Sequence, residues 1–215
     1  MRKLLTKKEA IEVIEILKEE YPDVRCELNH NSPFELLIAT ILSAQCTDVR
    51  VNMVTDKLFK KYNTPLDFVN LGAQGIEPLI KSCGFYKNKA KNIYLASKEL
   101  IEKYNSEVPK TIEELMTLNG VGRKTANVVA SNCFGVAAIA VDTHVFRLSN
   151  RIGFVDESDV LKTEMALQKK IPKSLWTLSH HLLIFHGRRV CSARNPNCSS
   201  CNISNYCRYY RRMLG

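Results

Sequence analysis

Apolar residues recur at helical spacing through most of the chain. Behind Gly122, for example, one face of a helix would carry Ala126, Val129, Ala130 and Cys133. The single β-like stretch, residues 136–141, is too isolated to form a sheet. The pattern therefore predicts an all-α protein of about ten helices joined by short loops.

Short polar motifs mark where these helices begin. Residues 6–9, 32–35 and 111–114 each have the spacing of a capping box, in which two side chains satisfy two backbone N–H groups. Thr64-Pro65 places a proline at a first helical position. Residues 36–42 form an apolar run far shorter than the ~20 residues of a membrane span, so we expect a buried helix there.

Composition adds the expectation of a folded protein with a polyanionic partner. The 215 residues are 45% hydrophobic and 25% charged, enough for one or two cores and too apolar for a disordered chain. The net charge of +9 favours a polyanion as partner, with a merely basic surface as the alternative. No apolar signal region or transit segment precedes residue 6, so we expect an intracellular protein of the cytoplasm or nucleoid, without a membrane anchor.

One loop combines a backbone grip for anions with a candidate nucleophile. Two glycines permit positive φ and close backbone approach, and the helix that follows offers N–H groups and the positive end of its dipole to a phosphate. The glycine spacing fits neither a Walker loop nor a dinucleotide-binding fingerprint. An ordinary helix start with an exposed lysine is the alternative. The candidate phosphate loop comprises Leu118, Gly120, Val121, Gly122, Arg123, Lys124 and Thr125.

Four of the eight cysteines crowd together as Cys191-x6-Cys198-x2-Cys201-x5-Cys207. Thiolates select zinc or iron and sulfur, and four of them fit either a tetrahedral zinc ion or a 4Fe-4S cluster. Structural zinc usually takes two tight pairs of cysteines, whereas only one pair is tight here, so the spacing favours the cluster. Two disulfides are disfavoured without a secretory signal. Residues 191–207 are therefore predicted to form a metal-stapled subdomain.

Arginines flank the cysteine segment, and the other cysteines are scattered. We expect the arginines to form a basic surface that contacts backbone phosphates without reading sequence. They are Arg188, Arg189, Arg194, Arg208, Arg211 and Arg212. We expect Cys26, Cys46, Cys83 and Cys133 to be small buried hydrophobic side chains.

Three motifs in this order resemble the endonuclease III family: the phosphate loop followed by Ala126-Asn127-Val128-Val129, then Val141-Asp142-Thr143-His144, then the four-cysteine segment. The likeness extends back through Ser43-Ala44-Gln45 and covers nearly the whole chain. The family consists of helix-hairpin-helix DNA glycosylases with AP lyase activity, so the resemblance implies base excision repair of damaged double-stranded DNA. It also implies a 4Fe-4S cluster and a DNA-binding cleft between two domains. The expected domains are a six-helix domain of residues 27–136 and a cluster-bearing domain of residues 1–26 and 137–215. We expect a monomer.

The resemblance assigns Lys124 as a nucleophile that displaces an oxidised pyrimidine and forms a Schiff base with the sugar. β-Elimination from this Schiff base would then cleave the strand 3′ to the abasic site. The helix N-terminus disfavours the ammonium form of Lys124, which agrees with that role. The apolar spacing after Asp142 predicts an N-cap, while the resemblance assigns Asp142 to lysine activation and to stabilising positive charge on the sugar.

Further residues are candidates for contact with DNA. By resemblance, Gln45 would fill the gap left by the flipped nucleotide. Phe85 would wedge the opposite strand, with a buried aromatic side chain as the alternative. His144 would contact phosphate or stabilise packing, and packing is favoured for His180, His181 and His186. Asn119 departs from the proline that is common at its position in the family.

Two other functions stay open. A monofunctional mismatch glycosylase would use Asp142 to activate water in place of attack by Lys124. A non-catalytic DNA-binding module would need neither residue, and the presence of both argues against it.

Overall fold

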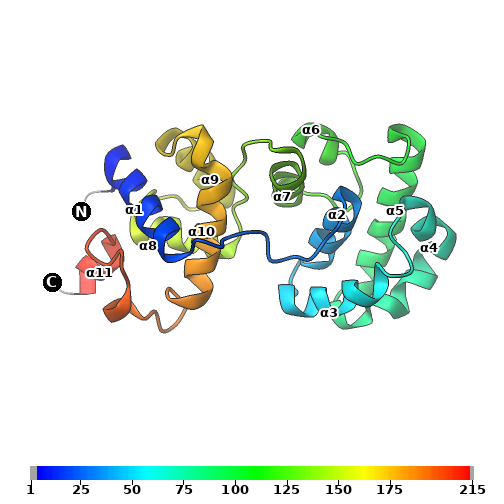
Figure 1. Cartoon of the computed structure of the whole chain (residues 1–215), viewed down its shortest axis with the longest axis horizontal. Helices are drawn as coiled ribbons and strands as arrows, with labels where there is room; N and C mark the ends of the chain where they lie inside the picture. Colours follow the sequence, from blue (N-terminus) through cyan, green and yellow to red (C-terminus); the bar gives the residue numbers. More distant parts are fainter. Residues whose placement is uncertain (1–3, 214–215) are drawn as a thin grey trace. The chain divides into compact units, whose positions relative to one another are not determined.

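The structure, a computed structural model, describes residues 4–213. That part of the chain contains eleven α-helices and three short 3-10 helices and no strand, so the predicted all-α class is confirmed (Figure 1). The α-helices are α1 (Lys7–Glu20), α2 (Pro33–Leu42), α3 (Asp48–Leu58), α4 (Pro65–Ile80), α5 (Tyr86–Tyr104), α6 (Ile112–Leu115), α7 (Arg123–Phe134), α8 (Thr143–Ile152), α9 (Val160–Lys170), α10 (Trp176–Arg189) and α11 (Arg208–Met213). The 3-10 helices are η1 (Lys81–Cys83), η2 (Lys173–Leu175) and η3 (Cys198–Ser200). None of the helices described is both long and apolar enough to cross a membrane.

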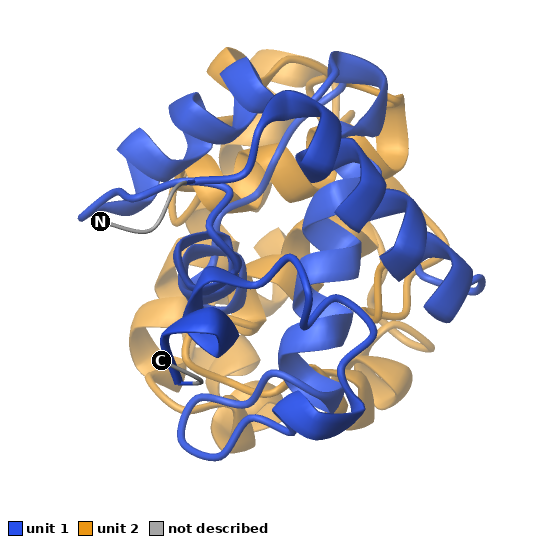
Figure 2. Ribbon diagram, turned by 90° about the vertical axis from the view of Figure 1, so that its left-hand side faces the viewer, with its two compact units in different colours: residues 1–25, 137–215 blue, residues 26–136 orange. Residues whose placement is uncertain are grey.

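The chain divides into two compact units, coloured separately in Figure 2. One unit consists of residues 26–136 and contains α2 to α7. The other consists of residues 1–25 and 137–215 and contains α1 and α8 to α11.

Helix α2 is the central element of the unit formed by residues 26–136. Every residue from Phe34 to Leu42 on this helix is buried, because its sequence is apolar on all sides. The buried helix predicted at residues 36–42 is thereby confirmed. Helix α7 packs against α2, and α4 packs along α5. An edge-on contact between Phe34 and Phe68, with 5.5 Å between ring centroids, joins α2 to α4.

The second unit is built on the contacts of α10 with α1 and α8. Its core includes Leu17 of α1, Leu148 of α8 and Leu182 of α10, all fully buried. The beginning and the end of the described chain meet here: the Tyr206 hydroxyl donates to the Glu12 carboxylate over 3.1 Å. The four-cysteine segment thus packs on the first helix of the protein.

The predicted helix starts are confirmed, but only one of the three predicted capping boxes is complete. At α1, Thr6 and Glu9 satisfy each other's backbone N–H groups. Ser32 accepts from the Glu35 N–H, yet the Glu35 carboxylate accepts from the N–H of Asn31 and not of Ser32. At α6, Thr111 Oγ1 accepts from the Glu114 N–H and so caps the helix. The Glu114 carboxylate accepts from the Thr111 hydroxyl, where a capping box would use the Thr111 backbone N–H. Pro65 occupies the first turn of α4 as expected.

The four scattered cysteines are less buried than predicted. All eight cysteines are free thiols in the structure. Only Cys83 among the scattered four is fully buried, and Cys26, Cys46 and Cys133 are partly exposed. The prediction of buried hydrophobic side chains is wrong for these three, because they lie at helix ends and in loops at the edge of the core.

Candidate functional site

The candidate phosphate loop connects α6 to α7, and Lys124 is the second residue of α7. Gly120 has φ +75° and so adopts the positive φ that a glycine permits. Gly122 is the N-cap of α7 with φ −89° and does not use that freedom. A Cβ atom at Gly122 would meet no protein atom within 4 Å. The glycine therefore leaves the start of α7 open to close approach by a ligand.

Side chains in this loop divide into anchors and exposed groups. Leu118 and Val121 are buried and fix the turn, in which the Val121 N–H donates to the Leu118 carbonyl over 3.1 Å. Arg123 is exposed, and Lys124 and Thr125 are partly exposed. The Val121 N–H is therefore engaged within the loop, and the first turn of α7 is the part that faces outward.

Asn119, which departs from the family pattern, ties the loop to α5. Its backbone N–H and its side-chain amide each donate to the Glu99 carboxylate over 2.8 Å. Gly120 lies so close to α5 that an added Cβ would stand 2.7 Å from Cβ of Asn92. A proline at position 119 would lack the donating N–H. The position of the loop in this chain thus depends on a carboxylate of another helix, which local sequence patterns do not reveal.

Asp142 belongs to the other unit and caps α8. Its Oδ1 accepts from the Val145 N–H over 2.8 Å, which confirms the predicted N-cap. A carboxylate has a second oxygen and several lone pairs, so the cap leaves Asp142 capable of a further contact. Two residues on, His144 Nδ1 lies 3.3 Å from Nη2 of Arg147. His144 therefore has a packing contact in α8, and its phosphate contact stays a prediction.

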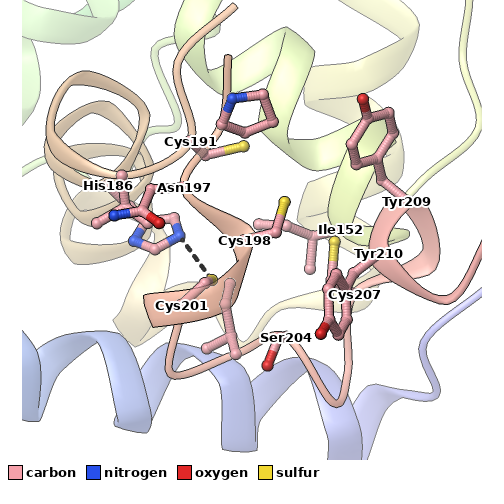
Figure 3. Close-up of a pocket in the computed structure, with 13 residues that line it drawn as sticks. Ile152, His186, Cys191, Asn197, Cys198, Cys201, Ser204, Cys207, Tyr209 and Tyr210 are labelled. Atoms are coloured by element: carbon pink, nitrogen blue, oxygen red, sulfur yellow. Dashed lines mark hydrogen bonds between the residues drawn. The ribbon is translucent and has the colours of Figure 1, made fainter. Parts of the chain in front are cut away.

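The four cysteines of residues 191–207 line one cavity, as Figure 3 shows. Ile152, His186 and Tyr209 are among the other residues around it. Four thiols around one space are a ligand set for a tetrahedral zinc ion or for an iron–sulfur cluster.

Hydrogen bonds to the sulfur atoms come from Arg151, which the sequence did not single out, and from His186, for which the sequence favoured packing. Arg151 Nη1 lies 3.7 Å from Cys191 Sγ, and His186 Nε2 lies 3.4 Å from Cys201 Sγ. The other ring nitrogen of His186 lies 3.0 Å from the Tyr21 hydroxyl. Burial lowers the pKa of His186, so the ring is neutral, with one donating and one accepting nitrogen. The packing role favoured for His186 is therefore only part of its role, because both ring nitrogens also contact polar groups.

Two arginines of α8 also hold the backbone of the cysteine segment. Arg147 Nη2 donates to the carbonyls of Gly187 and Cys191, and Arg151 donates to those of Ser192 and Ala193. The helix that Asp142 caps is therefore fastened to the loop between the first two cysteine ligands. Both arginines are half-buried and lie about 40 positions before the carbonyls of the cysteine segment that they hold, so residue spacing near the cysteines does not reveal them.

The expected basic surface needs one correction. Arg188 and Arg194 are exposed, as a phosphate contact requires. Arg208 is buried and pairs with both oxygens of Asp156 at 2.8 and 2.9 Å, so it is a structural residue. Its guanidinium lowers the pKa of the Asp156 carboxyl through those hydrogen bonds.

Gln45 and Phe85 are exposed side chains on strained backbone in the unit of residues 26–136. Their φ angles of 52° and 45° lie in the left-handed region that disfavours residues with a Cβ. Phe85 is 69% exposed, so the alternative of a buried aromatic side chain is wrong. Strain combined with exposure is typical of positions shaped for a ligand.

His180 and His181, the other two histidines of α10, lie side by side in that helix. His180 is fully buried and stacks on His181 with 4.0 Å between ring centroids. Burial lowers the pKa of His181 to about 4, so it is neutral at physiological pH. Packing is confirmed for this pair.

Comparison with known proteins identifies the family. Residues 38–173 match the family model described as "HhH-GPD superfamily base excision DNA repair protein", and residues 191–207 match the "Iron-sulfur binding domain of endonuclease III". The chain belongs to the endonuclease III family. It is accordingly a base excision repair enzyme of the DNA glycosylase/lyase class, and its four-cysteine segment binds an iron–sulfur cluster.

Relatives in this family resemble the chain over most of its length. Endonuclease III of Bacillus subtilis is 52% identical over 189 residues, covering 87% of this chain and 86% of that protein. Endonuclease III of Escherichia coli K12 is 46% identical over 209 residues, covering 97% and 99%. A non-covalent endonuclease III–DNA complex superposes with a TM-score of 0.94 at 50% identity, covering 98% and 99%. A trapped covalent endonuclease III–DNA intermediate matches with the same TM-score and identity, covering 99% and 100%.

Proposed function

We propose that this enzyme removes oxidised pyrimidines from double-stranded DNA through a Schiff base on Lys124 and then cleaves the strand 3′ to the abasic site. The observation that carries the proposal is the position of Lys124, in the first turn of α7 behind the open glycine N-cap. A phosphate held at this helix start would bring the sugar of the same nucleotide toward the lysine side chain. Trapped covalent DNA on an endonuclease III of 50% identity supports this chemistry.

The reaction begins when the neutral amine of Lys124 attacks C1′ of the sugar. The C1′–N bond to the base breaks, and its electron pair leaves with the base, which takes up a proton. Ring opening gives an iminium between Lys124 Nζ and C1′, which acidifies the C2′ proton. Loss of this proton expels the 3′ phosphate, and water releases the lysine.

Asp142 has two tasks in this proposal. As N-cap it fixes the first turn of α8 through the Val145 N–H. As a carboxylate it stabilises the positive charge that develops on the sugar and assists deprotonation of Lys124. The second task needs the charge, whereas the first needs only an acceptor atom.

DNA contacts in this proposal come from backbone and side-chain groups of both units. The phosphate loop and the exposed Arg188 and Arg194 would bind phosphates, and His144 would contact a phosphate as well. Gln45 and Phe85 would enter the base stack, Gln45 in the gap of the extruded nucleotide and Phe85 beside the opposite strand.

The cluster in this proposal is of the 4Fe-4S type, held by Cys191, Cys198, Cys201 and Cys207. Its contribution is structural: four metal–thiolate bonds would hold together a segment that contains little regular secondary structure. Arg151 and His186 would orient and stabilise the thiolates through their N–H groups. Iron and sulfide analysis against visible absorbance checks the cluster type.

Borohydride trapping tests the proposal. A duplex with one thymine glycol is incubated with native protein or with Lys124→Ala in the presence of borohydride. We expect a covalent adduct with native protein and none with the variant. Lys98→Ala, which removes an exposed lysine of α5 outside the phosphate loop, is the matched control, and it should still form the adduct because Lys124 is kept. Base release without an adduct in the native protein would contradict the Schiff base.

The monofunctional alternative shares the fold, so the fold alone does not decide. A thermostable thymine-DNA glycosylase superposes with a TM-score of 0.83 at 25% identity. Lys124 is the residue that favours the lyase. Borohydride trapping separates the two functions, because a glycosylase that uses water as its nucleophile forms no covalent adduct with DNA.

We also propose that the enzyme acts as a monomer on cytoplasmic or nucleoid DNA. Bacterial relatives such as those of Bacillus subtilis and Escherichia coli support the location. Sedimentation of the free protein and of its complex with a short lesion-bearing duplex tests the stoichiometry, and a dimer in either state would contradict it.

A further inference from the structure

Lys89 of α5 is a buried lysine that joins the loop carrying Gln45 to the loop carrying Phe85. It is only 5% exposed, although it lies in a helix whose other lysines are exposed. Its Nζ donates to the Leu42 carbonyl over 2.8 Å and to the Cys83 carbonyl over 2.7 Å. Leu42 is three residues before Gln45, and Cys83 is two residues before Phe85.

Both acceptors are carbonyls at the ends of helices. Leu42 is the last residue of α2, and Cys83 is the last residue of η1. Carbonyls at a helix C-terminus lack partners within the helix and carry the negative end of its dipole, so a cation is favourable there. One ammonium group thus caps two helices at the points where the chain leaves them.

Lys89 holds the Phe85 loop through its backbone as well. Its N–H donates to the Phe85 carbonyl over 3.0 Å, which is the first helical hydrogen bond of α5. The loop between Cys83 and α5 is strained, with φ values of 66° at Gly84 and 45° at Phe85. Such a conformation persists only when surrounding contacts enforce it.

Burying an ammonium group costs free energy of folding unless its hydrogen bonds are made, so a lysine at this core position stabilises the protein only through those hydrogen bonds. An apolar side chain of the same length would fill the space without that cost. The thiols of Cys46 and Cys83 lie near Lys89, and Arg50 lies near Cys83. Among these groups only Lys89 bonds both loop carbonyls.

We propose that Lys89 is a positioning residue that presets the two loops whose side chains enter the DNA at a lesion. The inference rests on the insertion roles of Gln45 and Phe85 in the proposed function. With the tether present, both loops are ordered before DNA binds, so less conformational entropy is lost when the side chains insert. Without it, insertion and extrusion of the nucleotide lose affinity, while phosphate contacts elsewhere stay intact.

Lys89→Met tests this role, because methionine keeps the apolar stem and cannot donate hydrogen bonds. Lys98→Met is the matched control: it removes an exposed lysine from the same helix. Dissociation constants are measured on a duplex with a stable abasic analogue and on the same duplex undamaged. We expect Lys89→Met to weaken binding to the abasic duplex by about 10- to 100-fold, the scale of small misplacements at a site. Binding to undamaged duplex and both constants of Lys98→Met should stay at native values.

A second measurement separates loop presetting from general damage to the fold. A single-stranded abasic oligonucleotide has no stack to invade, so Lys89→Met should form a borohydride adduct with it at the native rate. If Lys89→Met weakens binding to both duplexes equally, or forms the single-strand adduct slowly, the residue is merely structural. If the methionine variant does not fold, Lys89→Gln replaces it, because glutamine has no positive charge and its nitrogen is one bond closer to the backbone, yet it can still donate a hydrogen bond.

Gln45→Ala and Phe85→Ala in the same assays distinguish failure of the proposed Lys89 tether from failure of the insertion roles on which it rests. If both alanine variants lose the preference for the abasic duplex and Lys89→Met keeps it, the tether is overturned and the insertion roles stand. If neither alanine variant loses that preference, the insertion roles fail, and the inference about Lys89 fails with them.

Discussion

Replacing Asp142 with asparagine should abolish most catalysis and leave the fold almost unchanged. The Asp142 side chain accepts one hydrogen bond, from the Val145 N–H over 2.8 Å. Asparagine presents the same acceptor atom and ranks beside aspartate at helix N-caps. It lacks the negative charge that the proposed mechanism places near the sugar.

The structure sets the expected magnitudes. Asp142→Ala removes one cap, which costs ~1 kcal/mol in typical helices. For a chain of this size that corresponds to about 2–4 °C in the melting temperature. Loss of the charge should reduce the single-turnover rate of base release by about 10²- to 10³-fold, as for other groups that stabilise a transition state. The rate should fall equally in Asp142→Asn and Asp142→Ala, whereas only the alanine variant should melt earlier.

Thermal unfolding followed by circular dichroism gives the first quantity, and single-turnover cleavage of a thymine glycol duplex gives the second. Binding to undamaged duplex is the control and should be native in both variants. If Asp142→Asn keeps the native rate, the charge has no catalytic role. If the asparagine and alanine variants melt at the same temperature, the N-cap does not contribute to stability.

Three further predictions follow from contacts in the unit that binds the cluster. Gly153→Ala should destabilise the protein by about 1–3 kcal/mol, read from thermal unfolding, because a residue with a Cβ is strained at φ +100° and the new Cβ would lie 3.0 Å from Cβ of Arg208. Arg151→Met should make the visible absorbance of the cluster disappear faster in the presence of a chelator, and Arg194→Met is the exposed control. Equal rates of loss in the two variants would contradict a role of Arg151 at the thiolates. The Asp156–Arg208 ion pair should stabilise the folded protein at pH values above the ordinary pKa of an aspartate. Because the pKa of Asp156 is lowered in the folded protein, this stabilisation is lost as the pH falls through that lowered pKa. The melting temperatures of native protein and Asp156→Asn should therefore converge below about pH 4.

Local hydrogen bonding explains which features the sequence predicted well. The caps at Thr6 and Asp142 join residues three positions apart, so residue types at that spacing suffice to predict them. The positive φ of Gly120 is likewise a property of one residue and its neighbours. The four cysteines were recognisable because they lie close together in the sequence and few other functions need four thiols.

The sequence by itself therefore determined the helical class and the helix starts, and it supplied the candidate cluster ligands and the candidate nucleophile. Only the tertiary structure decided how these parts are held, because the deciding partners are distant along the chain. Tyr21 meets His186 across 165 positions, Lys89 reaches Leu42 across 47, and Asn119 reaches Glu99 across 20. Each of these contacts depends on which helix faces bury together, and no spacing rule within one helix encodes that. Phe85 is another example: its sequence context allowed either a buried or an exposed aromatic side chain, and only the packing of the helices shows that it is exposed.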